Sequence, residues 1–264
     1  FFGFKNAGFF VDVGAFDGIH LSNSYVFERR GWTGICVEAA PQYYELCAKN
    51  RPGSRCVHAA CGAEEGRVDL RFEPGGLFSG IGSDAQAVSQ VFARVGAQFQ
   101  GFQSINVPMT TLNRLLESHS GPIDFLSLDV EGHEIDELKG LELKRYRPNV
   151  LLIEANTTAD REALDTYLAS HGYRHARANG WNHFYVATED DRQKLRAIVM
   201  SAKLACPQHP LGEGYKHFGY PENPYIYRGV EKESHRSWAA LNDPTAFRGG
   251  LHDCRCFDQC KRLP

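Results

Sequence analysis

The chain has 264 residues, 42% of them hydrophobic and 23% charged, and a net charge of −3. This length can bury the core of one large α/β domain or of one domain with an appendage. Lys and Arg are spread along the chain, which excludes a protein that binds nucleic acid through a basic surface, and no apolar run reaches the roughly twenty residues of a membrane helix. Because the chain opens on Phe1 rather than Met, we expect a trimmed chain and leave an N-terminal signal or anchor open.

The first predicted element is a buried parallel strand over residues 9–13 that runs into a glycine turn. Gly14 and Gly18 give the pattern Asp-x-Gly-x-x-x-Gly, which differs from the Gly-x-Gly-x-x-Gly of dinucleotide sites. Asp12 would repel a pyrophosphate but suits a ligand with a cationic end, such as the amino group of S-adenosylmethionine. The alternative is an ordinary glycine turn after a strand.

A short helix over residues 21–30 is predicted next, with Ser22 and Asn23 placed to cap its start. The following predicted strand, residues 33–38, ends in an acid. In nucleotide-binding α/β folds an acid at the end of the second strand accepts hydrogen bonds from both ribose hydroxyls. We therefore favour Glu38 as a ribose ligand over an exposed acid at a strand end.

The middle of the chain predicts a mixture of helices and strands. Pro41 begins a helix over residues 42–49, and a third strand over 55–61 carries Ala59 and Ala60 near its end. These small residues leave room for a flat adenine ring, although they also pack well in any core. Further predicted elements are strands at 66–72 and 104–109, helices at 87–97 and 112–119, and a glycine-rich flap loop at 74–82.

The densest chemical signal lies between a fourth parallel strand, residues 123–129, and a helix over 135–141. This junction holds four ionisable residues in six positions: Asp129, Glu131, His133 and Glu134. In a doubly wound sheet it faces the same crevice as the first glycine turn. The positive end of the following helix accounts for the two glutamates but leaves Asp129 and His133 unexplained.

A fifth strand over residues 149–154 ends in another acid, Glu154, and Asn156 follows it. A helix over 160–171 comes next, and an Asn-Gly-Trp-Asn turn then predicts a hairpin with strands at 173–178 and 183–188. The residues thus predict a doubly wound α/β fold of five α/β repeats closed by an antiparallel hairpin.

Together these motifs resemble the FkbM-type methyltransferases. The stretches that carry the resemblance are residues 9–18, 22–28, 31–38, 127–134 and 152–154. The resemblance covers residues 1–188 and implies a class I, Rossmann-like methyltransferase domain with a mostly parallel seven-stranded sheet whose last strand is antiparallel.

The resemblance also implies S-adenosylmethionine as the cofactor. Asp12, Gly14 and Gly18 would lie at its methionine end, Glu38 on its ribose, and Asp129 near its sulfonium. The full set that we assign to the cofactor is Asp12, Gly14, Ala15, Asp17, Gly18, Asn23, Glu38, Ala39, Ala60 and Asp129.

Family members are mostly O-methyltransferases of sugars, lipids or natural products, so we expect methylation of a hydroxyl on a glycan or small molecule. N-methylation and a catalytically silent binding module are the alternatives. A nicotinamide dehydrogenase is disfavoured because the chain lacks Gly-x-Gly-x-x-Gly at the first turn. We expect no nucleic-acid partner.

We assign catalysis to His133, Asp129 and Glu131. Methyl transfer is an in-line displacement in which a proton must leave the acceptor as charge builds on its oxygen. Histidine takes up protons near neutral pH, and His133 is the histidine of this crevice. A divalent metal held by Asp129, Glu154 and Asn156 is possible but not favoured, and alignment without a base is the third option.

Residues 189–264 are predicted to be an irregular extension that contains many Pro and aromatic residues. Four cysteines in it, Cys206, Cys254, Cys256 and Cys260, could bind zinc, but Cys-x-Cys is tight for the usual ligand spacing. We favour disulfides, which would place the protein in a secretory lumen; free thiols would point to the cytoplasm. Cys36 lies in an apolar run and is expected in the core.

Overall fold

The computed structural model describes residues 2, 5–72, 79–80, 85–94 and 99–196. The chain forms two units, Phe1–Arg196 and Ala197–Pro264, and the second lies outside the described residues. The zinc or disulfide candidates and most of the predicted flap loop also lie outside them. The predicted domain boundary after residue 188 stays a prediction.

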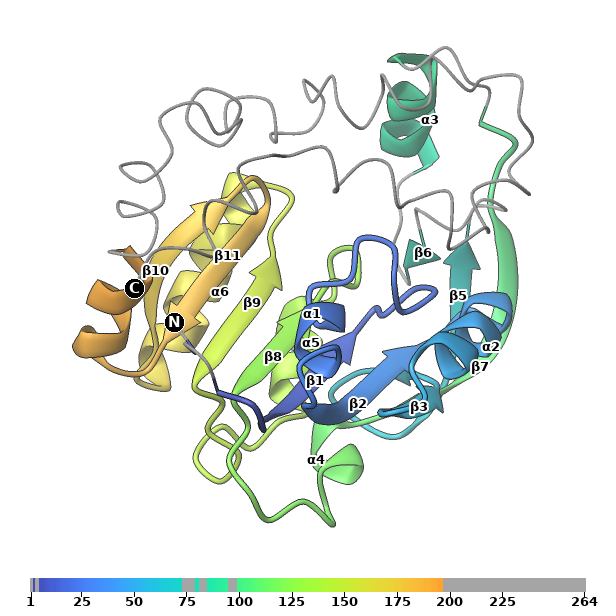
Figure 1. The fold of residues 1–264 in the computed structure, drawn as a ribbon. Helices are drawn as coiled ribbons and strands as arrows, with labels where there is room; N and C mark the ends of the chain where they lie inside the picture. Colours follow the sequence, from blue (N-terminus) through green and yellow to red (C-terminus); the bar gives the residue numbers. More distant parts are fainter. Residues whose placement is uncertain (1, 3–4, 73–78, 81–84, 95–98, 197–264) are drawn as a thin grey trace, which may run out of the picture. The chain divides into compact units, whose positions relative to one another are not determined.

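The first unit is built on a seven-stranded sheet with the order β10-β11-β9-β8-β1-β2-β3 (Figure 1). Its strands are β1 (Phe9–Val13), β2 (Thr33–Glu38), β3 (Arg55–His58), β8 (Phe125–Leu128), β9 (Val150–Glu154), β10 (Arg174–Asn179) and β11 (Asn182–Val186). Neighbouring strands pair in parallel except at β11, which is antiparallel to both β9 and β10. The predicted doubly wound, mostly parallel seven-stranded sheet is confirmed.

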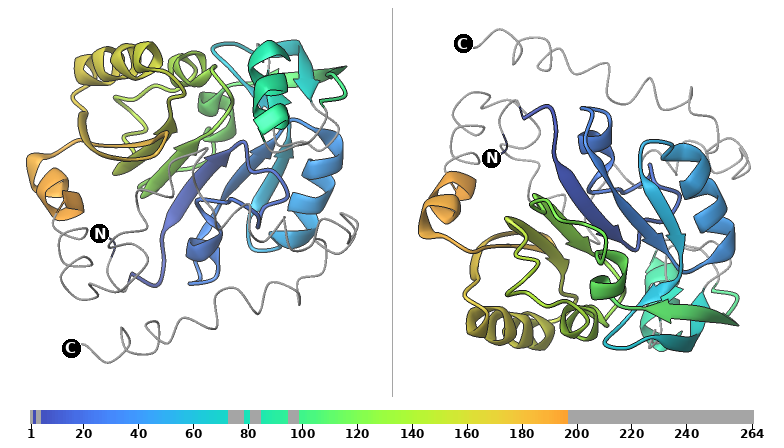
Figure 2. Two further views of the ribbon diagram at one scale, coloured as in Figure 1. Left: turned by 90° about the horizontal axis from the view of Figure 1, so that it is seen from above. Right: turned by 90° about the horizontal axis from the view of Figure 1, so that it is seen from below.

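Helices cover both faces of this sheet because its central strands are apolar on both sides (Figure 2). One face packs α4 (Leu112–Leu115), α5 (Glu134–Lys139) and α6 (Thr158–Ser170) against residues such as Val11 and Val13. The other face packs α1 (Tyr25–Glu28), α2 (Pro41–Asn50) and a helical segment at 189–196 against residues such as Phe10. Cys36 is buried on this second face, as its apolar run predicts.

A second, four-stranded sheet has the order β4-β7-β5-β6. Its strands are β4 (Ala60–Cys61), β5 (Gly66–Phe72), β6 (Ser79–Gly80) and β7 (Gln103–Thr110), and α3 (Ala85–Arg94) lies between β6 and β7 in the chain. The predicted single strand over 55–61 is therefore wrong in one respect. Ala59 bonds to the Glu38 carbonyl of the large sheet, after which Ala60 pairs with Met109 of the small one.

The predicted helix over 21–30 is also too long, since α1 spans only Tyr25–Glu28. Ser22 and Ser24 donate their hydroxyls to the Asp12 carboxylate, and Asn23 donates to the hydroxyl of Ser127 on β8. Ser22 still accepts the backbone N–H of Tyr25, the first residue of α1, at 3.1 Å, whereas the Asn23 side chain makes a long-range hydrogen bond instead of a cap. At the start of α4 the Thr111 hydroxyl accepts the backbone N–H of Arg114.

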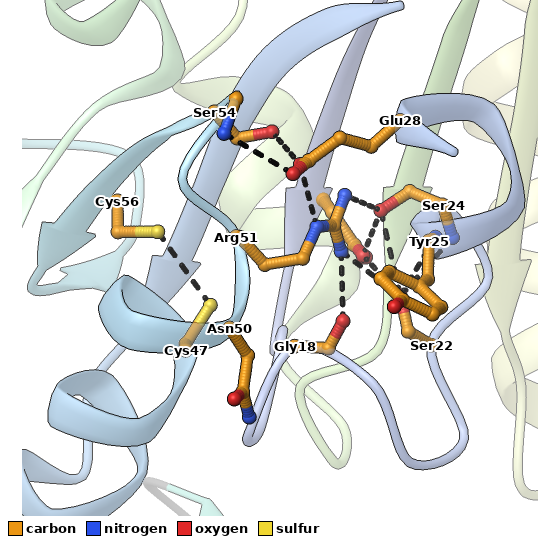
Figure 3. A network of polar contacts seen from close by, with 12 residues as sticks. Gly18, Ser22, Ser24, Tyr25, Glu28, Cys47, Asn50, Arg51, Ser54 and Cys56 are labelled. Atoms are coloured by element: carbon orange, nitrogen blue, oxygen red, sulfur yellow. Dashed lines mark hydrogen bonds and ion pairs between the residues drawn. The ribbon is translucent and has the colours of Figure 1, made fainter. Parts of the chain in front are cut away.

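One fully buried cation, Arg51, ties α2 to the loop that follows β1 (Figure 3). Its Nε donates to Glu28 Oε2 at 2.7 Å, and its Nη1 donates to the Gly18 carbonyl at 3.0 Å. Its Nη2 donates to Ser24 Oγ at 3.0 Å, and this hydroxyl in turn donates to Asp12. The guanidinium therefore links two carboxylates and the glycine turn.

We predict that Arg51→Ala lowers the free energy of unfolding by about 3–5 kcal/mol. The cause is the loss of a buried ion pair, which leaves the Glu28 carboxylate unpaired in a place where water replaces the guanidinium poorly. Urea unfolding followed by circular dichroism measures the change.

The matched control is Arg161→Ala on α6, whose ion pair with Asp165 is at the surface and should be worth about 0.3–0.5 kcal/mol. A double variant, Arg51→Met with Glu28→Gln, should recover part of the loss because it leaves no unpaired charge at that position. Equal losses for Arg51→Ala and Arg161→Ala would contradict the structural role of the buried cation.

Candidate functional site

The carboxyl ends of four parallel strands meet at one edge of the large sheet. Val13 of β1 is in register with Val37 of β2 and with Leu128 of β8, and Leu128 is in register with Ile153 of β9. The residues that end or follow these strands are Gly14, Glu38, Asp129 and Glu154. The structure thus brings together the glycine turn and the three strand-end acids that the sequence singles out.

The glycine turn needs glycine at both predicted positions. Gly14 has a φ of +79°, and a Cβ there would lie 1.9 Å from the carbonyl oxygen of Asp129. Gly18 has a φ of +81°, and a Cβ there would lie 2.6 Å from Cγ of Arg51. The backbone of the turn therefore fits between β8 and α2 without room for side chains at these points.

Glu38 is buried at the end of β2 and already accepts two backbone hydrogen bonds. Phe16 N–H donates to Oε2 and Ala40 N–H donates to Oε1, both at 2.8 Å. Burial raises the pKa of Glu38 to about 7 against the opposing effect of these hydrogen bonds. Phe16 itself has a φ of +50°, so the loop holds a non-glycine residue in the left-handed region beside this carboxylate.

Three other predicted cofactor residues make internal contacts that shape the loop. Asp12 accepts the Ser22 and Ser24 hydroxyls, and Asn23 donates to Ser127 Oγ at 3.2 Å. Asp17 accepts the backbone N–H of Ile19 at 2.9 Å and that of His20 at 2.8 Å, and it also contacts the His20 ring. Their part in cofactor binding stays a prediction.

The alanines of the predicted cofactor set are mostly covered. Ala15 is buried and its N–H donates, together with that of Gly14, to the Val37 carbonyl at 3.0 Å. Ala39 is partly exposed, and His58 Nε2 lies 3.1 Å from its carbonyl oxygen. Ala60 is buried in a small apolar cluster with Ala40, where it pairs in the second sheet.

Two carboxylates that follow β8 and one at the end of β9 form a tight acidic cluster at the same edge. One oxygen from each of Asp129, Glu131 and Glu154 lies within 4.8 Å of the others, a spacing that could hold a metal ion. Asn156 donates its amide to Glu154 Oε2 at 3.2 Å. Glu131 is therefore a third carboxylate candidate beside Asp129 and Glu154, and Asn156 as a ligand stays a prediction.

The acidic cluster raises the pKa of its own members. Burial, followed by the charges of Asp129 and Glu134, raises the pKa of Glu131 to about 8. Burial and the charges of Asp129 and Glu131 raise the pKa of Glu154 to about 10. Burial also raises the pKa of Asp129, although a hydrogen bond with Glu154 opposes the shift. The site therefore favours a cation or bound protons over free negative charge.

His133 sits at the N-cap position of α5, beside this cluster in the sequence. Its Nδ1 lies 3.8 Å from Asp136 Oδ2, and its side chain makes no capping hydrogen bond to the helix. Glu134 instead accepts the N–H of Gly132 at 3.0 Å and that of Val130 at 3.4 Å. The His133 side chain therefore does not cap α5.

Sequence reasoning missed Arg51, which holds the glycine turn through a hydrogen bond to the Gly18 carbonyl. In the sequence it stands at the end of a helix before Pro52-Gly53, which is typical of an exposed cation at a helix end. Glu28 and Ser24 could have indicated a buried cation, because both belong to a motif whose polar side chains need hydrogen-bond partners once they are buried.

A model of the methyltransferase FkbM domain matches residues 12–175 of this chain. These residues run from Asp12 in β1 through most of the large sheet to His175 in β10. No curated protein matches the chain in a sequence search.

Solved structures that match include several methyltransferases. The METTL16 MTase domain is 12% identical over 71% of this chain and 62% of its own, with a TM-score of 0.40. The N-terminal domain of human METTL16 in complex with SAH is 12% identical over 69% of this chain and 62% of its own, with a TM-score of 0.37. An O-methyltransferase from Bacillus cereus in complex with SAH is 13% identical over 68% of this chain and 73% of its own, with a TM-score of 0.35. The chain spans less than two thirds of these METTL16 domains.

We predict that Glu154→Gln makes the protein more stable at pH 8 by roughly 1–2 kcal/mol and flattens its pH dependence. A carboxyl whose pKa rises on folding holds a proton that the unfolded chain releases above about pH 4.3. The folded state therefore binds more protons than the unfolded state, and stability falls as the pH rises toward 8–10. Urea unfolding between pH 6 and 9, with chelator present, measures the slope.

Glu162→Gln on the exposed side of α6 makes the same charge change away from the cluster and should leave the slope as in the wild type. Identical slopes for all three proteins would show that the cluster does not carry the predicted protons.

Proposed function

This chain belongs to the FkbM methyltransferase family, and we propose that it methylates a hydroxyl of a sugar, glycan or other small molecule. The family and the fold support the coarser statement that it is an S-adenosylmethionine-dependent methyltransferase. The observation that carries the proposal is the meeting of Gly14, Glu38 and Asp129 at the carboxyl edge of one parallel sheet.

The residues at this edge fit the cofactor. Each oxygen of Glu38 accepts one backbone N–H, and a carboxylate has about four acceptor sites, so each oxygen can still accept a ribose hydroxyl. The acidic cluster of Asp129, Glu131 and Glu154 complements the positive charges of the sulfonium and amino groups. When bound, S-adenosylmethionine supplies the electrophilic methyl group.

The charge of the site favours a neutral acceptor. Carboxylates at the strand ends repel phosphodiesters, and the chain has a net charge of −3. Neutral hydroxyls, as in sugars, can donate hydrogen bonds to the same carboxylates. An amine acceptor, which would make the protein an N-methyltransferase, is the second candidate because the cluster also attracts cationic groups.

Residues of the β8–α5 junction would then align the acceptor and take its proton. His133 is the proposed base, and Asp129 and Glu131 would orient the hydroxyl. In the alternative, Asp129, Glu131 and Glu154 would hold a divalent cation that acidifies the hydroxyl. We favour the histidine base without metal.

A labelled-methyl transfer screen with glycans, small alcohols and amines tests the proposal. Transfer to hydroxyl acceptors supports it, and transfer to amines alone overturns the O-methylation part. Thermal shift with S-adenosylmethionine but without any transfer would favour a silent binding module, whereas stabilisation by a dinucleotide alone would contradict the cofactor assignment.

We predict that Glu38→Ala weakens binding of S-adenosylhomocysteine by about 2–4 kcal/mol, from roughly 1.5–3 kcal/mol per charged hydrogen bond with some replacement by water. Because the pKa of Glu38 is about 7, wild-type affinity should fall as the pH drops below 7 and the carboxylate is protonated. Calorimetric titration at pH 6, 7 and 8 measures both effects.

Glu38→Gln should bind weakly at each of these pH values, because its side chain carries no titrating charge. Glu45→Ala, on the exposed side of α2, is the matched control and should bind as the wild type does. Thermal unfolding checks that the loss is not a loss of fold, since Glu38 also holds two backbone N–H groups. Wild-type affinity for Glu38→Ala would sink the ribose assignment.

We predict that His133→Ala lowers kcat by roughly 10²–10⁴ and leaves affinity for S-adenosylhomocysteine unchanged, because a general base acts on the acceptor proton alone. Steady-state kinetics with the best acceptor from the screen and calorimetry measure the two quantities. His171→Ala, at the end of α6, is the control histidine.

The metal alternative predicts a different result. Chelator would abolish turnover, Mg²⁺ or Mn²⁺ would restore it, and His133→Ala would retain most activity. Activity that resists chelator and also survives His133→Ala would defeat both arrangements and leave alignment as the source of rate enhancement.

A further inference from the structure

Three thiols converge beneath the cofactor loop, outside the site described above. Cys36 of β2, Cys47 of α2 and Cys56 of β3 each place a sulfur within 4.8 Å of the other two. The sulfurs of Cys47 and Cys56 are 3.7 Å apart (Figure 3). All three are free thiols in this structure.

The thiol cluster touches the glycine turn directly. A Cβ at Gly18 would lie 3.1 Å from Cys47 Sγ, so the turn packs against this sulfur. The neighbouring residues of α2 also hold the turn: Asn50 donates to the Asp17 carbonyl at 2.9 Å and Arg51 donates to the Gly18 carbonyl at 3.0 Å. A change at Cys47 is therefore one contact away from the loop that would receive the cofactor.

The three thiols differ in access and in acidity. Cys36 and Cys47 are fully buried, whereas Cys56 is partly exposed. Hydrogen bonds from the Cys36 and Cys47 thiols lower the pKa of Cys56 to about 3, and the positive charge of Arg51 acts in the same direction. Cys56 is thus the thiolate that a reagent from solvent reaches first, and the buried Cys47 sulfur lies 3.7 Å from it.

We propose that Cys47 and Cys56 are a redox modification site, in which a reversible disulfide forms on reaction with a small disulfide such as oxidised glutathione and weakens cofactor binding. A disulfide needs its sulfurs about 2.05 Å apart, so the bond draws Cys47 Sγ toward β3. This movement takes the sulfur out of its place against Gly18. The link to the cofactor rests on the proposed function; the disulfide itself does not.

The reaction proceeds in two exchanges. The Cys56 thiolate attacks one sulfur of the small disulfide, whose S–S bond breaks and releases one thiolate. The Cys47 thiol then attacks the Cys56 sulfur and passes its proton to the departing thiolate, which forms the protein disulfide and releases the second small thiol. Two protein thiols are oxidised, and one external disulfide is reduced to two thiols.

A metal held by the three thiols is less favoured than the disulfide. Metal binding would require all three to be deprotonated. Hydrogen bonds to Cys47 and Cys56, followed by burial, raise the pKa of Cys36, and the nearby charge of Asp12 raises it further. Three thiolates would also need a nearby positive charge, and the guanidinium of Arg51 already donates hydrogen bonds to Glu28 and Ser24.

Peptide mapping after alkylation tests the site in the full chain, and it separates this pair from the cysteines beyond residue 196. Treatment with oxidised glutathione should yield one Cys47–Cys56 crosslink, which dithiothreitol reverses. Cys47→Ala should trap a glutathione adduct on Cys56, whereas Cys36→Ala should still form the crosslink. Free alkylation of Cys56 after oxidation, a Cys36–Cys56 crosslink, or one zinc or copper ion per chain bound to these thiols would overturn the proposal.

Calorimetry with S-adenosylhomocysteine tests the coupling. The oxidised wild type should bind at least about fivefold more weakly than the reduced protein, and Cys47→Ala should show no change with oxidant. By linkage, saturating S-adenosylhomocysteine should make the disulfide harder to form by the same factor. Equal affinities of a fully crosslinked and a reduced protein would overturn the coupling, whereas no binding by the reduced protein would count against the proposed function instead.

Discussion

The arrangement of the glycine turn at the carboxyl edge of the large sheet depends on the buried guanidinium of Arg51. An unpaired charge in this position would cost several kcal/mol, so the structure surrounds it with the Glu28 carboxylate, the Gly18 carbonyl and the Ser24 hydroxyl. These partners come from α1, from the glycine turn and from the segment between them. Asp12, the first residue of the glycine motif, is therefore held indirectly: Arg51 orients the Ser24 hydroxyl, which donates a hydrogen bond to Asp12.

The other half of the edge has the opposite character. Asp129, Glu131 and Glu154 lie with their carboxylates close together. Burial raises the pKa of all three, and the charges of neighbouring acids raise those of Glu131 and Glu154 further. Glu131 also takes a left-handed backbone conformation, with a φ of +58°, that an ordinary loop avoids. A fold keeps such an unfavourable arrangement where a cationic or proton-donating ligand offsets it, which is why this half is the proposed place of reaction.

Local patterns predicted the strands well because each is a continuous apolar run, as in β1, β8 and β9. The Asn-Gly-Trp-Asn turn predicted the closing antiparallel hairpin, and the resemblance added the number of seven strands, whereas no local pattern contains their order in the sheet. What sequence reasoning missed depends on long-range contacts. Asn23 donates to Ser127 of β8 instead of capping α1, and Arg51 forms a buried ion pair with Glu28, 23 residues earlier in the chain. The convergence of the three thiols is invisible for the same reason, since it requires the register of β2 and β3 and the placement of α2.

The glycine turn lies between Arg51 on one side and the acidic cluster on the other. Substitutions on these two sides should change the free energy of unfolding in opposite directions. Gly14 packs against the carbonyl of Asp129 and Gly18 packs against Arg51, so the turn has no free space on either side. Close-packed contacts of this kind transmit a displacement rather than absorb it. Removing the cation should therefore cost both stability and cofactor affinity. Neutralising an acid of the cluster should instead stabilise the protein without cofactor, because it removes repulsion between carboxylates. The same change should weaken binding of a cationic cofactor, since that ligand also relieves the repulsion and gains binding free energy from it.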